Sequence, residues 1–110
     1  MIFIDSKVSL RPISPTVLGS NVTLYCDLFN ELPDNVFWSK RPANSSNTIN
    51  FINTNNIPIR YKMKMKSKSL YYSEATLTIY GIKMDDVAIF ACTGSMSSKR
   101  NLTLARMVKI

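Results

Sequence analysis

Hydrophobic and polar residues alternate along several short stretches of this sequence, and this period of two constrains the fold more than any other feature. In residues 21–28 (NVTLYCDL) hydrophobic side chains occupy every second position, and residues 75–79 (ATLTI) repeat the pattern. Residues 36–38 and 88–92 carry shorter versions of it. Because successive side chains of an extended strand point to opposite faces, the pattern predicts half-buried β-strands.

Turn-forming residues separate these runs. Gly, Pro, Asn and Ser gather at residues 18–20, 33–35, 41–46 and 55–58, and Gly81 follows another run. Short strands at such spacing predict an antiparallel sandwich or barrel. No stretch has the spacing of a long amphipathic helix, and a chain of 110 residues is of single-domain size. We therefore predict one all-β domain spanning residues 1–110.

The sequence contains no histidine, which narrows its chemistry. Histidine is the commonest general base near neutral pH and the commonest metal ligand, so the usual nucleophilic triads and zinc sites cannot form. Carboxylates are few, and the adjacent pair Asp85 and Asp86 points to opposite sides of an extended chain. Three glycines form no phosphate-binding loop. We predict that the protein is not an enzyme and that it holds no metal or cofactor.

Both cysteines, Cys26 and Cys92, fall on the hydrophobic sides of alternating runs. If the two strands lie on facing sheets, the thiols could bond across the core. Closing a loop of that length would stabilise the fold by about 4 kcal/mol in the chain-entropy model. The alternative is a pair of buried free thiols in a reducing compartment.

The segments around the cysteines, together with Trp38, resemble an immunoglobulin-superfamily domain over nearly the whole chain. The resemblance rests on VTLYC ending at Cys26, on VFW ending at Trp38, on DVAIFAC ending at Cys92, and on ATLTIYGI at residues 75–82. It implies an immunoglobulin-like two-sheet antiparallel Greek-key sandwich in which a Cys26–Cys92 disulfide joins the sheets and Trp38 packs against it. It also implies a structural ion pair between Arg60 and Asp86.

The sequence departs from the family pattern in two places. Phe90 stands where the family usually has a tyrosine, so its ring can pack in the core but cannot make the usual hydroxyl hydrogen bond. Residues 101–107, expected as the last strand, lack the glycine bulge of antigen-receptor chains. The interval from Trp38 to Cys92 leaves room for extra strands, so a variable-like or intermediate-type domain fits better than an antigen-receptor chain.

Three Asn-x-Ser/Thr sequons bear on the compartment. They begin at Asn21, Asn44 and Asn101, all in expected loops or strand starts where a glycan is tolerated. Together with a disulfide they favour a glycosylated protein that is secreted or displayed at the cell surface. No apolar run approaches the roughly 20 residues of a membrane span, so we expect none in this chain.

The most basic segment is YKMKMKSK at residues 61–68. Alternation places Tyr61, Met63 and Met65 on one face of the segment. The other face carries four lysines: Lys62, Lys64, Lys66 and Lys68. One interpretation is an anion-binding strip for a sulfated glycosaminoglycan, membrane headgroups or an acidic partner. The other is an edge strand whose lysines block aggregation. Nucleic acid is not an expected partner, because the strip has no exposed interleaved aromatic residues.

A candidate partner-binding surface follows from strand parity. If Trp38, Phe90 and Cys92 point inward, then Phe37, Ile89 and Ala91 point outward on neighbouring strands and form an exposed apolar patch. The segment 94–100, expected as a loop, would border it and add further contacts: Met96, Lys99 and Arg100. A glycan at Asn101 would lean over the same face.

These observations favour an extracellular protein-recognition module, such as a receptor, adhesion or immune-regulatory domain. Asn, Ile and Lys together number 30 against 18 for Gly, Ala, Pro and Arg. That composition suits AT-rich genomes, among them those of large viruses and parasites. The hypothesis therefore includes a secreted protein, encoded by a virus or a parasite, that intercepts a ligand of its host. The alternatives are a spacer within a multi-domain ectodomain, a glycosaminoglycan binder acting through residues 62–68, and a homodimer formed through the apolar patch.

Overall fold

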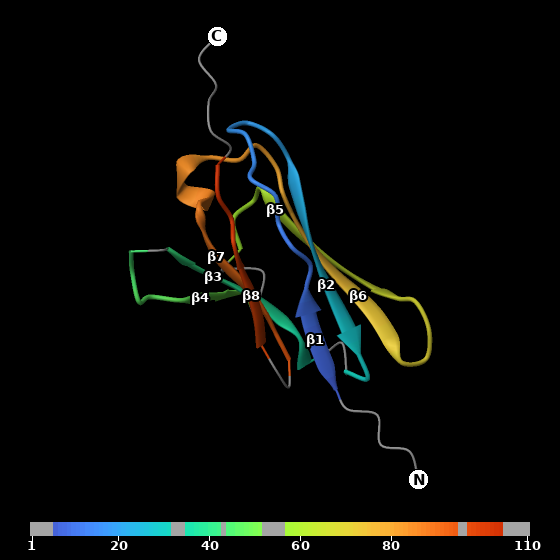
Figure 1. Cartoon of the computed structure of the whole chain (residues 1–110). Helices are drawn as coiled ribbons and strands as arrows, with labels where there is room; N and C mark the ends of the chain where they lie inside the picture. The colour runs from blue at the N-terminus through green and yellow to red at the C-terminus, as the bar shows by residue number, and fades with distance from the viewer. Residues whose placement is uncertain (1–5, 32–34, 43, 52–56, 95–96, 105–110) are drawn as a thin grey trace.

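The computed structural model describes residues 6–31, 35–42, 44–51, 57–94 and 97–104. These residues form two four-stranded antiparallel sheets that pack against each other (Figure 1). The prediction of an all-β, two-sheet antiparallel sandwich is confirmed.

The first sheet has the strand order β1-β2-β6-β5. Its strands are β1 (Lys7–Leu10), β2 (Val22–Phe29), β6 (Tyr72–Ile79) and β5 (Tyr61–Ser67). The second sheet has the order β4-β3-β7-β8. Its strands are β4 (Ile49–Phe51), β3 (Phe37–Pro42), β7 (Ala88–Thr93) and β8 (Ser97–Asn101), and a short 3-10 helix, η3 (Met84–Asp86), joins the sheets between β6 and β7.

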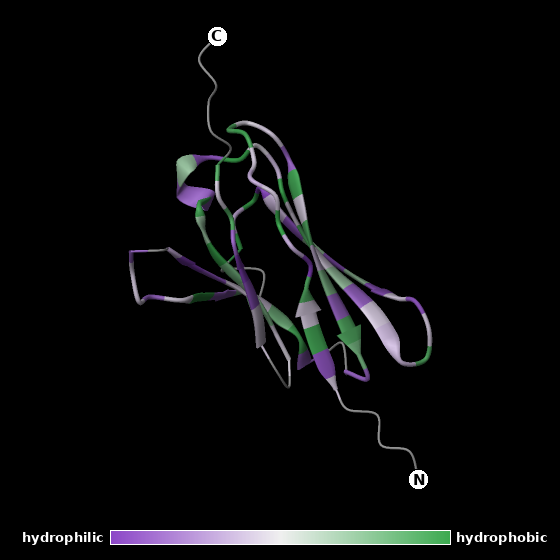
Figure 2. Ribbon diagram, in the orientation of Figure 1, coloured by the Kyte–Doolittle hydropathy of each residue, from purple (hydrophilic) through white to green (hydrophobic). Residues whose placement is uncertain are grey.

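The alternating sequence pattern explains the strands and their register. Leu24 on β2 lies opposite Leu77 on β6, and both side chains are buried between the sheets. The next pair along, Thr23 and Thr78, faces outward, and their hydroxyls hydrogen-bond at 3.0 Å. Figure 2 shows hydrophobic and hydrophilic positions alternating along β1 and β2. Each strand thus contributes one face to the core and one to the surface.

A disulfide joins the two sheets through the middle of the core. Cys26 on β2 is bonded to Cys92 on β7, and neither cysteine is accessible to solvent. Trp38 lies directly opposite Cys92 in the β3–β7 register and is 3% exposed. Phe90 is completely buried. The prediction of a Cys26–Cys92 bond is confirmed, and the alternative of free thiols is wrong.

Strand boundaries differ from the prediction at the C-terminal end. We expected a loop at residues 94–100 and a strand at 101–107, but β8 begins at Ser97 and ends at Asn101. Beyond it Leu102 is buried, and Leu104 forms an isolated parallel bridge with Thr16. The sequence SSKRN is polar at every position because β8 is an edge strand, so hydrophobic alternation could not reveal it.

Candidate functional site

The outward face of the β4-β3-β7-β8 sheet carries a groove of about 240 Å³. Three rows of side chains cross it, as the strand register shows. Phe37 lies opposite Thr93, Ser39 opposite Ala91, and Arg41 opposite Ile89. Strand β4 adds Asn50 beside Ser39, and β8 adds Lys99 beside Ala91. The structure therefore brings Phe37, Ile89 and Ala91 together on one face, as their parity predicted.

The shape of this face differs from the expected patch. Phe37, Ile89 and Ala91 are each half-buried rather than exposed, and Ser39 between them is only 6% exposed. The surface is thus a hollow with small side chains in the middle, not an apolar bulge. Sequence analysis missed Arg41 because residues 41–46 read as a turn, whereas β3 continues to Pro42. It also missed Ser39 and Asn50, which are polar and give no hydrophobic signal.

The charged side chains among the described residues that line the groove, Arg41 and Lys99, are both positive. Arg41 is held in place by a hydrogen bond that its Nη1 donates to the carbonyl of Ser45, at 3.1 Å. Lys99 is exposed on β8, at the other side of the groove. No acidic residue is among the described residues that line it. This arrangement provides binding contacts for an anionic group.

The other residues predicted to border this face are placed differently. Arg100 lies opposite the buried Phe90 in the β7–β8 register, so it belongs to the other side of β8 from Lys99. Its Nη1 donates to the carbonyl of Lys99 at 3.0 Å. Met96 lies outside the described residues. Asn101 is exposed and lies opposite Ile89, so a glycan there would stand beside the groove.

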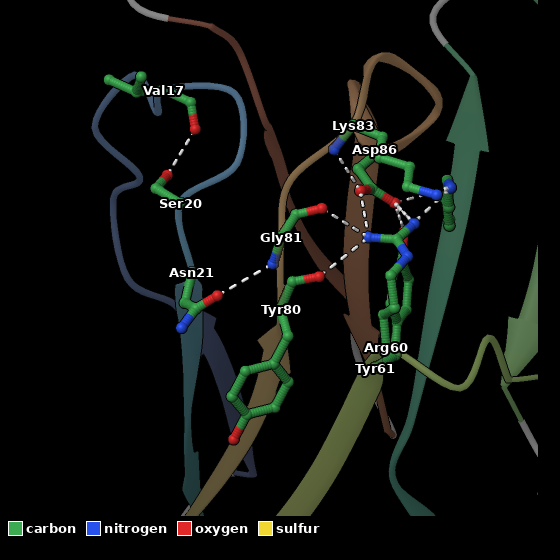
Figure 3. Close-up of polar contacts among 10 residues, drawn as sticks. Val17, Ser20, Asn21, Arg60, Tyr61, Tyr80, Gly81, Lys83 and Asp86 are labelled. Atoms are coloured by element: carbon green, nitrogen blue, oxygen red, sulfur yellow. Dashed lines mark hydrogen bonds and ion pairs between the residues drawn. The ribbon is translucent and has the colours of Figure 1, made fainter.

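Arg60 and Asp86 form the expected ion pair where β5 begins. The Asp86 carboxylate is 1% exposed and accepts two hydrogen bonds from the Arg60 guanidinium, at 2.9 and 3.1 Å. Arg60 Nη1 also donates to the carbonyls of Tyr80 and Gly81 (Figure 3). The guanidinium therefore ties the start of β5 to the segment between β6 and β7. Its role is structural.

Tyr61 and Lys40 complete this network, and the sequence analysis assigned neither of them to it. The Tyr61 hydroxyl donates to Asp86 Oδ1, and Lys40 Nζ donates to the Tyr61 hydroxyl at 3.0 Å. Tyr61 also packs against Phe90, with ring centroids 6.3 Å apart. A hydroxyl is thus present near this corner although Phe90 lacks one. The sequence signal for this role of Tyr61 was weak, because Tyr61 is the first residue of a segment dominated by lysine.

The network perturbs the acidity of its members. Burial by itself raises the pKa of Asp86, but hydrogen bonds from Arg60, Tyr61 and the Lys83 amide outweigh burial and bring the pKa below its usual value. Burial and the bond to Asp86 raise the pKa of Tyr61 far above its usual value. Burial lowers the pKa of Lys40, partly opposed by Asp86. Near neutral pH the carboxylate is therefore ionised and the phenol protonated.

The three sequon asparagines all have exposed side chains. Asn21 Oδ1 accepts a hydrogen bond from the Gly81 amide at 2.9 Å (Figure 3). Gly81 adopts a φ of 65°, a conformation that glycine tolerates best. Asn44 lies in a turn after β3. Glycosylation at these three sites stays a prediction.

The lysine strip lies on β5, at the edge of the first sheet and away from the groove. Lys62, Lys64 and Lys66 are exposed, and they lie opposite the outward residues Thr78, Thr76 and Glu74 of β6. Lys68 follows the strand, and its Nζ lies 4.0 Å from a Glu74 carboxylate oxygen. The edge position fits the anti-aggregation interpretation and also leaves the lysines accessible to an anionic partner.

A second polar cluster, which the sequence analysis missed, lies on the outward face of the first sheet. Arg11 Nη2 contacts Asp27 Oδ1 at 2.8 Å and Glu74 Oε2 at 2.7 Å, and the Tyr72 hydroxyl donates to Asp27 at 2.6 Å. The hydrogen bond from Arg11 lowers the pKa of Asp27. Three separate segments supply these residues, so no local sequence motif could have shown them.

The described residues contain no group of three or more His, Cys, Asp or Glu side chains placed to hold a metal ion. Within the same part of the chain, no helix has the length and apolar character needed to cross a membrane. Comparison with protein-family models and with curated proteins finds no match to this sequence.

Proposed function

We propose that this protein is an immunoglobulin-superfamily recognition domain, secreted or displayed at the cell surface, that binds an extracellular protein through the groove on the β4-β3-β7-β8 sheet. Three features support the family assignment. The Cys26–Cys92 bond joins the sheets, and Trp38 lies opposite Cys92. The two sheets also match in strand order the pairing of that family, with one added strand, β4.

The groove is the observation that carries the binding proposal. It combines half-buried apolar side chains, Phe37 and Ile89, with a narrow floor of Ser39 and Ala91. The other described side chains that line it are polar or cationic. Concave sites that combine apolar contacts with polar groups at defined positions are common binding sites in proteins. Strands rather than loops support every row of it, so the side chains are positioned in advance and lose little entropy on binding.

The charges select the class of partner. Arg41 and Lys99 flank the groove without an acidic residue among the described side chains that line it. A partner that inserts an apolar side chain beside a carboxylate would satisfy both features. A second copy of the same face would bring the same cations together, so a homodimer through this face is disfavoured.

A glycan at Asn101 would shape the footprint of the partner. Asn101 lies opposite Ile89 at the β8 edge of the face. An attached sugar would restrict approach from that side and direct the partner toward β3 and β4, where Phe37 and Asn50 lie.

The test is a binding screen of the purified domain against displayed extracellular proteins. Phe37→Asp should abolish binding to the selected partner, because it places a charge in the apolar row, while circular dichroism remains unchanged. Leu70→Asp is the matched control, since Leu70 is 86% exposed in the turn between β5 and β6. A Phe37→Asp variant that binds normally would refute this face. A wild-type domain that selects no partner would support a spacer role instead.

A further inference from the structure

We propose that the free edge of β5 is a second binding site, which takes an extended acidic segment of a partner protein as an added strand of the first sheet. The segment would alternate acidic and apolar residues. This site lies on a different sheet from the groove and is independent of the function proposed for the groove.

The first observation is the open edge. β5 ends the order β1-β2-β6-β5, and all seven of its residues, Tyr61–Ser67, pair with β6 on one side. Within the described part of the chain no strand pairs with its other side. Figure 1 shows the β5–β6 hairpin extending away from the β3–β4 hairpin of the other sheet. Such an edge presents backbone N–H and C=O groups that an incoming strand can pair with.

The second observation is the different chemistry of the two faces beside that edge. On the outward face Lys62, Lys64 and Lys66 repeat at every second residue and are all exposed. On the inward face Met63 and Met65 are 38% and 41% exposed. These methionines stay partly open to solvent although their β6 partners, Leu77 and Ala75, are buried.

Two hollows adjoin the methionine face. One, of about 300 Å³, lies between the sheets and is lined by Trp38, Phe51, Met63 and Met65 among others. The other, of about 350 Å³, is lined by Pro58, Ile59 and Met63 among others. Met63 lines both, so the hollows follow one another along the strand. A strand laid along β5 would direct alternate side chains into them.

Together these faces define the partner's sequence pattern. Residues of an added strand that share the outward face would lie opposite lysines, where acidic side chains form favourable cross-strand pairs. Residues on the other face would enter the hollows, where apolar side chains fit. Glu74 lies opposite Lys66 on β6, so this lysine already has an acidic neighbour across the strands. Lys62 and Lys64, opposite Thr78 and Thr76, are therefore the stronger contributors.

Two other occupants fit the site less well. A second copy of β5 would set the lysines of both strands opposite one another on the same face, and directly opposed like charges are destabilising. A sulfated polysaccharide would use the lysines but would leave both the backbone edge and the hollows without a partner. The acidic extended peptide is the occupant that uses all three features.

The experiment uses the whole domain and a fluorescent, blocked heptapeptide of alternating glutamate and valine, with binding followed by anisotropy. The lysine–valine counterpart should not bind. The combined substitution Lys62→Gln, Lys64→Gln and Lys66→Gln should weaken binding by about tenfold, since three cross-strand charge pairs are lost. The charge-matched control, Lys7→Gln with Lys83→Gln and Arg100→Gln, removes exposed cations outside both the strip and the groove and should leave binding close to that of the wild type.

Backbone methylation separates strand addition from simple charge attraction. Two further peptides carry N-methyl groups either on the glutamates or on the valines. Because alternate residues of a strand direct their amides to the same side, one of the two should lose binding and the other should keep it. Equal effects of the two methylations, or equal effects of the two triple substitutions, would overturn the proposal. So would a heparin oligosaccharide that binds these lysines where the peptide does not, because it would assign the strip to polysaccharide.

Discussion

The hydroxyl of Tyr61 on β5 donates a hydrogen bond to Oδ1 of Asp86 in η3, inside the same network that holds the Arg60 guanidinium. Tyr61 is 3% exposed and Asp86 is 1% exposed, so this contact is closed to solvent. It joins the edge strand of the first sheet to the connection that leads into the second. The end of the sandwich core beside η3 is thus closed by a polar contact rather than by hydrocarbon packing alone.

Tyr61→Phe should lower the free energy of unfolding by about 1.5–3 kcal/mol, the usual range for a hydrogen bond to a charged group. The ring would still pack against Phe90, and Asp86 would still be held by Arg60, so the fold should survive. Urea denaturation measures the change. Tyr80→Phe is the control, because Tyr80 is 46% exposed, and it should be close to neutral. Equal stabilities of the two variants would contradict this assignment.

The Asp86 network should make stability depend on acid pH. The pKa of Asp86 in the folded protein lies below its usual value, whereas in the unfolded chain it returns to about 3.9. The unfolded state therefore binds the proton first, so the contribution of the ionised carboxylate is complete above about pH 5 and is lost as pH falls through the folded pKa. Urea denaturation between neutral and strongly acid pH should show this loss.

Two asparagine variants test whether Asp86 causes that dependence. Asp86→Asn should be less stable at neutral pH and should lose less stability on acidification than the wild type. Asp85→Asn changes an exposed neighbour and should follow the wild-type curve. Parallel curves for all three proteins would remove Asp86 as the cause.

The disulfide should account for a large part of total stability. Replacing both Cys26 and Cys92 with alanine should lower the free energy of unfolding by about 4 kcal/mol, because the chain between them is no longer closed in the unfolded state. Labelling of the native oxidised protein with a thiol reagent should find no reactive cysteine. Labelling of both positions under non-reducing conditions would contradict the bond.

The lysines of β5 should be dispensable for folding. Their side chains are exposed on an edge strand, where isolated charges contribute little to stability. Changing Lys62, Lys64 and Lys66 to glutamine should shift the free energy of unfolding by less than about 0.5 kcal/mol, measured by urea denaturation. A larger loss would show that these side chains support the sheet itself, and it would remove their use as a neutral probe of peptide binding.

The sequence was sufficient to predict an all-β sandwich or barrel with Cys26 and Cys92 on inward faces, because these features depend on strand parity, which the alternation of hydrophobic residues records. It indicated the two-sheet sandwich, the disulfide and the packing of Trp38 through the family resemblance. It also indicated Arg60 and Asp86 through the family resemblance. The hydrogen bond of Tyr61 was not predicted, because its partner Asp86 lies far along the chain and its neighbours in sequence are lysines. The position of β8 was not predicted, because an edge strand can be polar on both faces and then shows no hydrophobic alternation. The hollow form of the groove depends on how Ser39 is enclosed, which parity alone does not specify.

The position of the Cys26–Cys92 bond divides the sandwich into two kinds of strand. β3, β4, β5 and β6 lie wholly within the covalently closed segment, whereas β1 precedes it and β8 follows it. The outer two strands can therefore detach by local fraying while the closed segment keeps its core, so their amides should exchange hydrogen for deuterium sooner than those of β3 and β6. Lys99 stands on one of these outer strands. A ligand seated in the groove would consequently slow exchange most on β8, far more than on the strands that the bond already encloses.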